Sequence, residues 1–463
     1  MSTTAIKDFT KGSITKQLIV FSLPLFLSNL LQVVYNMVDM IIVGAELGNP
    51  GISAVSVGGD VVTLLTFVAI GFSNAGQVLI ARYIGEKRRD KIGKFVGTMS
   101  AFLLISSVVI SALSLVFRDG ILLLMNTPDE AYSGALEYST VCMIGLVFIY
   151  GYNTVSAVLR GMGDSKHPFV FIAIAASVNV VLDLIFVFGL HLGAFGAGLA
   201  TVISQATSFV ISLIFLAKNK ERFSLNIGAR DLISFDGEML KDLVKLGTPM
   251  AIKMAAIQVS RLFVNSWVNS YSLAISAFSG IANKINSFAN LISAAMNTAG
   301  STIVGQNIAA GKTDRVKRTL GVLSVIMLSL ATAASVLVCI NPYPLFSLFT
   351  DEPDTLAIVD GYLPIVVLLF FGSALRAIMN ALLNGSGNYK VNFATAIFDG
   401  IIMRIGLSLL FGLALDMRHY GFWLGDALAG FTPFVIGIFF YFFGDWRKKD
   451  EKHKPASIVD KRD

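Results

Sequence analysis

The feature that most constrains this chain is the recurrence of long apolar stretches, each about as long as a bilayer is thick. A membrane-spanning helix needs about 20 predominantly apolar residues. Twelve such stretches follow one another along the 463 residues, at 16–43, 52–82, 95–117, 133–158, 168–190, 195–217, 242–270, 273–308, 319–341, 356–383, 391–413 and 420–443. Only 14% of the residues are charged, whereas soluble domains carry about 25%. The sequence therefore predicts an all-α integral membrane protein with twelve transmembrane helices, and it excludes a soluble enzyme.

A polar segment at the middle of the chain predicts its division into domains. Residues 218–241 form the longest polar interruption, and we interpret them as a cytoplasmic linker. They separate an N-terminal six-helix lobe at 1–217 from a C-terminal six-helix lobe at 242–446. A basic cytoplasmic tail at 447–463 completes the chain.

The distribution of lysine and arginine predicts the orientation in the membrane. If the N-terminus is cytoplasmic, 28 of the 36 basic residues fall in cytoplasmic segments and 2 fall in outer loops. Such an excess on the cytoplasmic side is the usual pattern of multi-pass proteins. We therefore expect both termini in the cytoplasm and a location in the cell (inner) membrane. This placement also explains the net charge of +6 without a nucleic-acid partner.

The two halves of the chain repeat one another at an almost constant offset. Asp90 corresponds to Asp314, and Ser100 corresponds to Ser324, at an offset of 224 residues. Because each unit would hold six helices, both units enter the membrane from the same side, as parallel repeats related by an axis along the membrane normal. Two such repeats favour alternating access to a central cavity over a continuous pore.

Polar groups within the apolar stretches of the first half predict a cation or proton site. A carboxylate at mid-bilayer costs about 2.5–3.5 kcal/mol on insertion scales, so it is rarely placed there without a role. The candidates for this site are Asp39, Asn179, Asp183 and Thr201. Their oxygens suit Na⁺, and burial of the carboxyl groups suits H⁺. The structural alternative is that each aspartate pairs with a neighbouring donor and holds two helices together.

The second half does not copy these acids. The positions 224 residues beyond Asn179 and Asp183 hold Met403 and Leu407, so we expect the coupling ion to bind in the first half. Charged residues in the second half form internal ion pairs or, alternatively, face the cavity and tune the charge of the substrate. The candidates for the substrate cavity are Gln32, Tyr35, Asn36, Asn153, Lys253, Arg376, Asp399 and Arg404.

A proline lies in the first predicted helix of each half. Pro24 and Pro249 each remove a backbone hydrogen bond, which bends a helix. Pro24 precedes Asp39 by fifteen residues. We therefore regard both prolines as hinge candidates, and static kinks are the alternative.

Four motifs, in this order along nearly the whole chain, resemble the multidrug and toxic compound extrusion (MATE) family. They are FSLPLFLSNLLQVVYNMVDMIIVG at 21–44, LRGMGDSKHP at 159–168, SVNVVLDLIFVFG at 177–189 and GSTIVGQNIAAGK at 300–312. The resemblance implies a two-lobed antiporter that exports organic cations and other drugs against H⁺ or Na⁺.

The pattern of site residues is similar to the branch named for DNA-damage-inducible proteins. The acid of that branch in the first helix matches Asp39, its asparagine and acid in the fifth helix match Asn179 and Asp183, and its threonine in the sixth helix matches Thr201. Another branch places an acid in the seventh helix, and none stands near Ile257 and Gln258.

The function expected from the sequence is secondary active efflux of hydrophobic or cationic organic compounds in exchange for H⁺ or Na⁺. We expect a monomer in the lipid bilayer, with no cofactor, metal site or nucleic-acid partner. A flippase for a lipid or lipid-linked oligosaccharide is the alternative within the same superfamily, and the basic residues of the second half keep it open. A channel is a third possibility, and it predicts ohmic conductance. No catalytic motif supports an enzyme.

Overall fold

The computed structural model describes residues 6–223 and 235–447, and all regular structure within these ranges is helical. The first half holds α1 (Ile14–Gly85), α2 (Asp90–Val116), α3 (Arg118–Leu124), α4 (Asp129–Ile144), α5 (Leu146–Gly161), α6 (Lys166–Asp183), η1 (Leu184–Gly189) and α7 (Gly193–Lys218). The second half holds α8 (Gly237–Asn269), α9 (Leu273–Ala309), α10 (Thr313–Ile340), α11 (Pro342–Ser347), α12 (Pro353–Leu356), α13 (Val359–Gly385), α14 (Tyr389–Ile397), η3 (Phe398–Ile402), α15 (Met403–Leu409), η4 (Leu410–Ala414), α16 (Arg418–Ala429), α17 (Thr432–Phe443) and η5 (Asp445–Arg447). The predicted all-α class is confirmed.

The helices differ in detail from the twelve predicted stretches. Helix α1 contains the first two of them, and its only non-helical residue is Gly48, which has a positive φ of 65°. Within the described residues, eight helices are long and apolar enough to cross a membrane, or nine if α4 and α5, bent by 51°, form one span. Helices α8 and α9 are long but do not meet this hydropathy criterion. The protein is therefore a multi-pass membrane protein, and the count of twelve spans stays a prediction.

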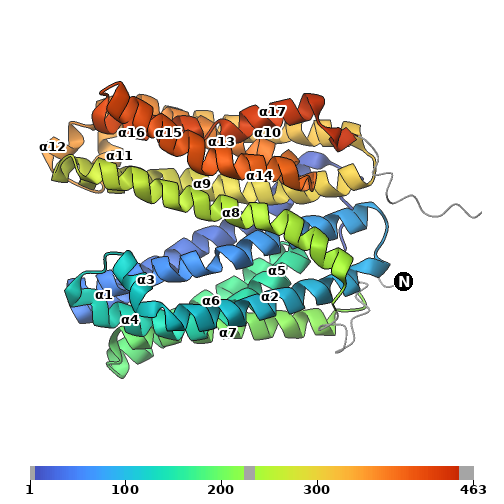
Figure 1. Cartoon of the computed structure of the whole chain (residues 1–463), viewed down its shortest axis with the longest axis horizontal. Helices are drawn as coiled ribbons and strands as arrows, with labels where there is room; N and C mark the ends of the chain where they lie inside the picture. Colours follow the sequence, from blue (N-terminus) through green and yellow to red (C-terminus); the bar gives the residue numbers. More distant parts are fainter. Residues whose placement is uncertain (1–5, 224–234, 448–463) are drawn as a thin grey trace, which may run out of the picture.

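The helices pack into two bundles that lie side by side (Figure 1). Helices α1 to α7 make up the N lobe, and α8 to α17 make up the C lobe. The buried apolar side chains form two clusters centred on the N lobe and a larger one centred on the C lobe. The predicted two-lobed architecture is therefore confirmed.

The first helix of each half begins in the core of the opposite lobe. Leu18 and Phe21 of α1 are buried in the C-lobe cluster, while Leu243 and Leu246 of α8 are buried in the N-lobe cluster. The packing of these two segments therefore differs from the predicted lobe boundaries. The physical reason is that both helices cross the interface between the lobes and bury an apolar face on each side of it.

The two prolines lie close to these crossing points, and neither interrupts its helix. Pro24 lies three residues after Phe21, and Pro249 lies three residues after Leu246. The backbone stays helical through both prolines, so neither proline ends its helix. The hydroxyl of Ser28 donates to the carbonyl oxygen of Pro24 at 2.8 Å.

The two lobes are joined at the end of the molecule where the described chain begins. There, the backbone N–H of Phe9 donates to Oε1 of Gln306 at 2.9 Å, and Nη1 of Arg82 donates to the carbonyl of Ser386 at 2.8 Å. Deeper in the interface, Nε2 of Gln77 donates to Oγ1 of Thr302 at 2.6 Å. We call this the basic end, because the segments that meet there are ones that the lysine and arginine pattern predicts to be cytoplasmic.

Residues 224–234 of the predicted linker and 448–463 of the predicted tail lie outside the described residues. Helix α8 begins at Gly237, inside the predicted linker. Its N-cap is Asp236, whose carboxylate accepts from the backbone N–H groups of Glu238 and Met239 at 3.0 Å. Nζ of Lys94 lies 2.7 Å from the same carboxylate, and this hydrogen bond, with those from the backbone, lowers the pKa of Asp236.

Candidate functional site

The two acids predicted for the N lobe lie next to each other inside it. Asp39 of α1 and Asp183 at the end of α6 are 4% and 0% exposed. Their carboxyl groups are within hydrogen-bonding reach of one another. No lysine or arginine of the described ranges bonds to either of them, and both carboxylate oxygens of Asp183 lack a protein donor. Two carboxylates cannot bond each other unless a proton is shared between them, so the adjacency of this pair agrees with the predicted proton or cation site.

A shell of neutral polar groups surrounds the acid pair. Asn179 is 1% exposed, and neither of its side-chain polar atoms has a partner among the described residues. Tyr138 of α4 contacts the hydroxyl of Thr201, and Tyr35 contacts the amide of Gln205. The four predicted residues therefore lie together in the N lobe. Their role as an ion site stays a prediction.

Two members of this shell were not identified from the sequence. Gln205 follows Thr201 by one helical turn, so the spacing on a single helix offered a signal for it. Tyr138 is not spaced by helical turns from any of the predicted ion-site residues along the sequence. Only the packing of α4 against α1 and α7 brings it to the acids.

The local backbone is widened at both polar clusters. Asp183 is followed directly by the π-helical turn η1, and Asp399 lies within the π-helical turn η3 of the C lobe. Such turns are rare and occur frequently at functional sites. They re-aim side chains and free a backbone carbonyl, which suits a site where polar groups must converge in an apolar surrounding.

Three other cavity candidates of the N lobe lie at its margin. Gln32 and Asn36 are exposed, although Gln32 also contacts the hydroxyl of Tyr35. Asn153 is half-buried, and its amide donates to the carbonyl of Ile149 one turn earlier at 2.8 Å. These positions neither confirm nor contradict a place in the substrate cavity.

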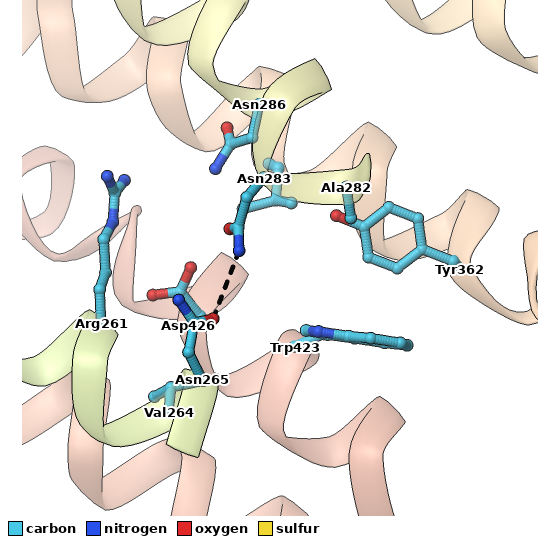
Figure 2. Close-up of a pocket in the computed structure, with 10 residues that line it drawn as sticks. Arg261, Val264, Asn265, Ala282, Asn283, Asn286, Tyr362, Trp423 and Asp426 are labelled. Atoms are coloured by element: carbon cyan, nitrogen blue, oxygen red, sulfur yellow. Dashed lines mark hydrogen bonds between the residues drawn. The ribbon is translucent and has the colours of Figure 1, made fainter. Parts of the chain in front are cut away.

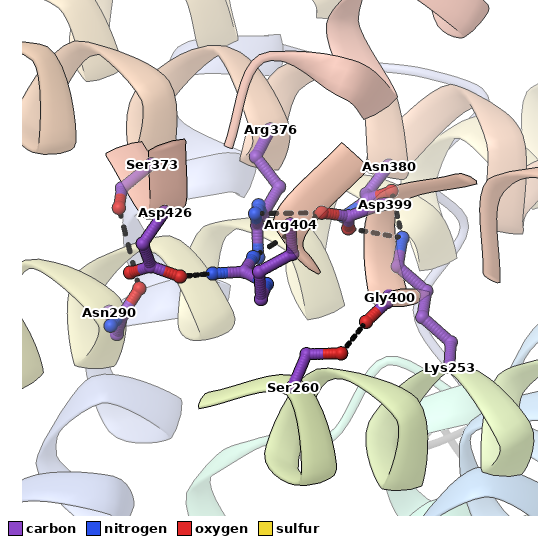
Figure 3. Close-up of polar contacts among 10 residues, drawn as sticks. All are labelled: Lys253, Ser260, Asn290, Ser373, Arg376, Asn380, Asp399, Gly400, Arg404 and Asp426. Atoms are coloured by element: carbon purple, nitrogen blue, oxygen red, sulfur yellow. Dashed lines mark hydrogen bonds and ion pairs between the residues drawn. The ribbon is translucent and has the colours of Figure 1, made fainter. Parts of the chain in front are cut away.

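Five charged residues inside the C lobe form one ion-pair network (Figure 3). Asp399 is fully buried, with Nη2 of Arg376 at 2.9 Å, Nη2 of Arg404 at 3.4 Å and Nζ of Lys253 at 3.9 Å. Arg404, 1% exposed, also donates to Asp426. Nζ of Lys253 donates to Oδ1 of Asn380 at 2.8 Å. Of the two alternatives that the sequence left open for the charged residues of the second half, internal ion pairing is therefore the one that Asp399 and Arg404 follow.

The network also contains groups that are not fully enclosed. The side chains of Lys253 and Arg376 are 14% and 16% exposed. Asp426, 18% exposed, was not among the sequence candidates, although its position as the single acid within the last apolar stretch was a readable signal. A small cavity beside it is lined by Arg261, Asn265, Asn283, Asn286, Trp423 and Asp426 (Figure 2).

The fold and the two clusters define the class of protein. Two membrane lobes of parallel topology, joined at one end and holding ionisable groups at their centre, are the architecture of a secondary transporter. A family model described as MatE matches residues 24–185 and again residues 249–410. Both ends of the two matches are offset by 225 residues, in agreement with the repeat. The chain belongs to the MATE family of multidrug efflux transporters.

Curated relatives match over nearly the whole chain. The probable multidrug resistance protein YoeA of Bacillus subtilis is 28% identical over 446 residues, which cover 95% of this chain and 96% of the relative. The probable multidrug resistance protein YpnP of the same organism is 29% identical over 444 residues, covering 95% and 97%. The fold is similar to a solved outward-facing multidrug resistance MATE family transporter, with a TM-score of 0.86, 22% identity and coverage of 97% and 100%.

Proposed function

We propose that this protein exports hydrophobic or cationic organic compounds in exchange for H⁺ or Na⁺, and that Asp39 and Asp183 bind the coupling ion. The observation that carries the proposal is the pair of adjacent buried carboxyl groups without a basic partner among the described residues. A structural ion pair would have included a lysine or arginine, as Asp399 does. Occupancy by a proton or cation removes the repulsion between the two acids, so occupancy changes the energy of the lobe.

Helix α1 provides a route from this site to the interface between the lobes. Its first turns pack in the C-lobe core, Pro24 follows them, and Asp39 lies farther along in the N lobe. A change of bend near Pro24 therefore moves the N-lobe acids relative to the C lobe. This arrangement supports the hinge role of Pro24, and that of Pro249 at the corresponding place in α8.

The contacts at the basic end support an outward-facing state. With that end cytoplasmic, the bonds of Gln306, Gln77 and Arg82 close the cytoplasmic side. In the proposed cycle, the substrate enters from the cytoplasm or inner leaflet while both acids are ionised. Outward opening then lets H⁺ or Na⁺ bind and weakens the substrate site.

The working unit that we propose is one chain in the cell membrane, with both termini cytoplasmic and no cofactor besides the coupling ion. A single chain is sufficient because its own two halves supply both lobes that enclose the proposed cavity.

Transport in proteoliposomes tests the proposal. Efflux of an ethidium-like dye is followed while a proton gradient and a sodium gradient are imposed separately. We expect one gradient to drive efflux by the wild type, and Asp39→Asn and Asp183→Asn each to abolish that drive. Asp119→Asn is the matched control, because this acid belongs to the same lobe and its side chain is 61% exposed. Unchanged gradient-driven efflux by Asp39→Asn would remove the mechanism.

The basic residues of the C lobe favour a second candidate, a flippase for a lipid or lipid-linked oligosaccharide. Lys253, Arg376 and Arg404 are the groups that a pyrophosphate would need. Asp399 and Asp426 already neutralise part of this charge, which supports the antiporter over the flippase. Competition against dye efflux by a lipid-linked precursor separates the two functions, since only a flippase would be inhibited strongly by the precursor.

A further inference from the structure

The polar network of the C lobe carries more positive than negative charge. It contains Lys253, Arg376 and Arg404, and Arg261 lies within the electrostatic reach of Arg376 and Asp399. The acids among them are Asp399 and Asp426. Four cations therefore face two carboxylates, in a part of the membrane where an unbalanced charge is strongly unfavourable. The buried acid pair of the N lobe, Asp39 and Asp183, has the opposite imbalance, since no cation in the described part of the chain bonds to it.

One of the four cations, Arg261, lies at the small cavity (Figure 2). Arg261 lines this cavity and has no hydrogen-bond or ion-pair partner within the described ranges, whereas Asp426 on the same wall is bonded to Arg404. Asn286, 7% exposed, also lines the cavity, and its side-chain oxygen has no partner. The guanidinium of Arg261 therefore has donors available for an anion, whereas the unpartnered oxygen of Asn286 is a hydrogen-bond acceptor.

The size of the cavity limits what can fill it in this state. Its volume is about 20 Å³, which is close to the space of a single water molecule. The cavity therefore admits at most one polar group of a larger solute. The group that suits an unpaired guanidinium is an anion, because arginine binds carboxylates and phosphates through charge-assisted hydrogen bonds.

We propose that this C-lobe cavity binds the anionic group of a zwitterionic amphiphile, with Arg261 as the residue that recognises a carboxylate or phosphate. The positive end of the same solute then lies toward Asp39 and Asp183 of the N lobe. The inference rests on the proposed export function for its physiological meaning, but it concerns binding, and binding is measured without a gradient.

Two matched dyes test it at neutral pH in detergent micelles. The first is a zwitterionic rhodamine with a free carboxylate, and the second is its ethyl ester, which carries only the cation. Fluorescence anisotropy gives the dissociation constant of each dye. The variants are Arg261→Gln, the charge-conserving Arg261→Lys, and Arg118→Gln, which removes an exposed charge from the N lobe.

We expect the wild type to bind the zwitterion more tightly than the ester. Arg261→Gln weakens binding of the zwitterion about tenfold or more, as loss of a hydrogen bond between charged groups predicts, and changes the ester by less than about twofold. Arg261→Lys keeps most of the preference, and Arg118→Gln keeps all of it. Equal affinity of the wild type for both dyes, or an equal change of both dyes in Arg261→Gln, overturns the inference.

A second variant covers the case in which Arg261→Gln does not fold. Asn286→Asp is nearly isosteric and supplies a carboxylate to Arg261 from within the protein. We expect it to abolish the preference for the zwitterion, and a retained preference contradicts the proposal. Failure of gradient-driven efflux with the binding preference intact would refute the antiporter and leave the anion site standing. Gradient-driven efflux without a preference for the zwitterion would refute the anion site and leave the antiporter standing.

Discussion

The close contact of α1 with α8 at the lobe interface leads to a quantitative prediction for Gly71→Ala. A Cβ atom at residue 71 would lie 2.6 Å from both the Cα and the backbone nitrogen of Ala251. Backbone atoms cannot rotate away, so the two helices must separate by about 1 Å to reach ordinary contact distance. Gly59, in the same helix, has no atom within 4 Å of its added Cβ, and Gly59→Ala is therefore the matched control.

The size of the effect follows from the cost of overpacking. Inserting a methyl group into a packed contact costs about 1–3 kcal/mol. Because this contact belongs to the state with the basic end closed, the whole cost falls on that state. The equilibrium between the two states should therefore shift by about 5- to 150-fold toward opening of the basic end.

Distances between spin labels at the opposite end measure this shift. Leu124 is the last residue of α3, and Leu348 directly follows α11. Both helices lie at the end of the molecule away from the N-terminus (Figure 1). Both are well exposed, at 81% and 77%. Labels are placed there by Leu124→Cys and Leu348→Cys in a Cys339→Ser background, since Cys142 is buried. We expect Gly71→Ala to populate a shorter distance and Gly59→Ala to match the wild type. A wild-type distribution for Gly71→Ala, or the same change in both variants, would refute the reasoning.

Two further predictions concern stability. Asp399→Asn leaves Arg376 without its buried carboxylate and should destabilise the protein by about 3–5 kcal/mol. Asp183→Asn removes an unpaired acid and should leave the thermal unfolding midpoint in detergent unchanged or higher. A lower midpoint for Asp183→Asn argues for a structural role. Because the folded-state pKa of Asp236 is lowered, its stabilisation of the first turn of α8 is present above the unfolded value of 3.8 and is lost as the pH falls through the lower folded value. The protection of backbone amides 237–241 against exchange, relative to the intrinsic exchange rate at the same pH, should therefore fall in acid. Asp236→Ala, which lacks the N-cap and costs about 1 kcal/mol, should remove this pH dependence of the protection.

The membrane fold was predictable because its main determinants are local in the sequence. The length and hydropathy of the apolar stretches required helices, and the offset between Asp90 and Asp314 revealed the duplication that the family model repeats. The crossing of α1 and α8 was not predictable. Leu18 and Leu243 are apolar whichever lobe they pack against, so hydropathy does not distinguish the two cores.

The acid pair was predictable only in part. Asp39 and Asp183 each stood out as a carboxylate in an apolar stretch, but their separation of 144 residues left their contact open. Tyr138 and Gln205 complete the shell around them only through the packing of α4 and α7. Structural pairing requires a basic side chain beside each aspartate, whereas ion binding requires that none is bonded to it. Which side chains lie beside an aspartate is decided by tertiary packing.

Sequence alone therefore determined the membrane environment, the helices, the repeat and the types of ionisable group, since hydropathy, charge and spacing are read directly from the order of the residues. Tertiary structure decided which charges are paired. Among the described residues, it placed three cations around Asp399 and none at Asp183, and it left Arg261 beside a small cavity. The reason is that the free energy of a buried charge depends on the groups within a few ångströms of it, and packing between distant segments selects those groups.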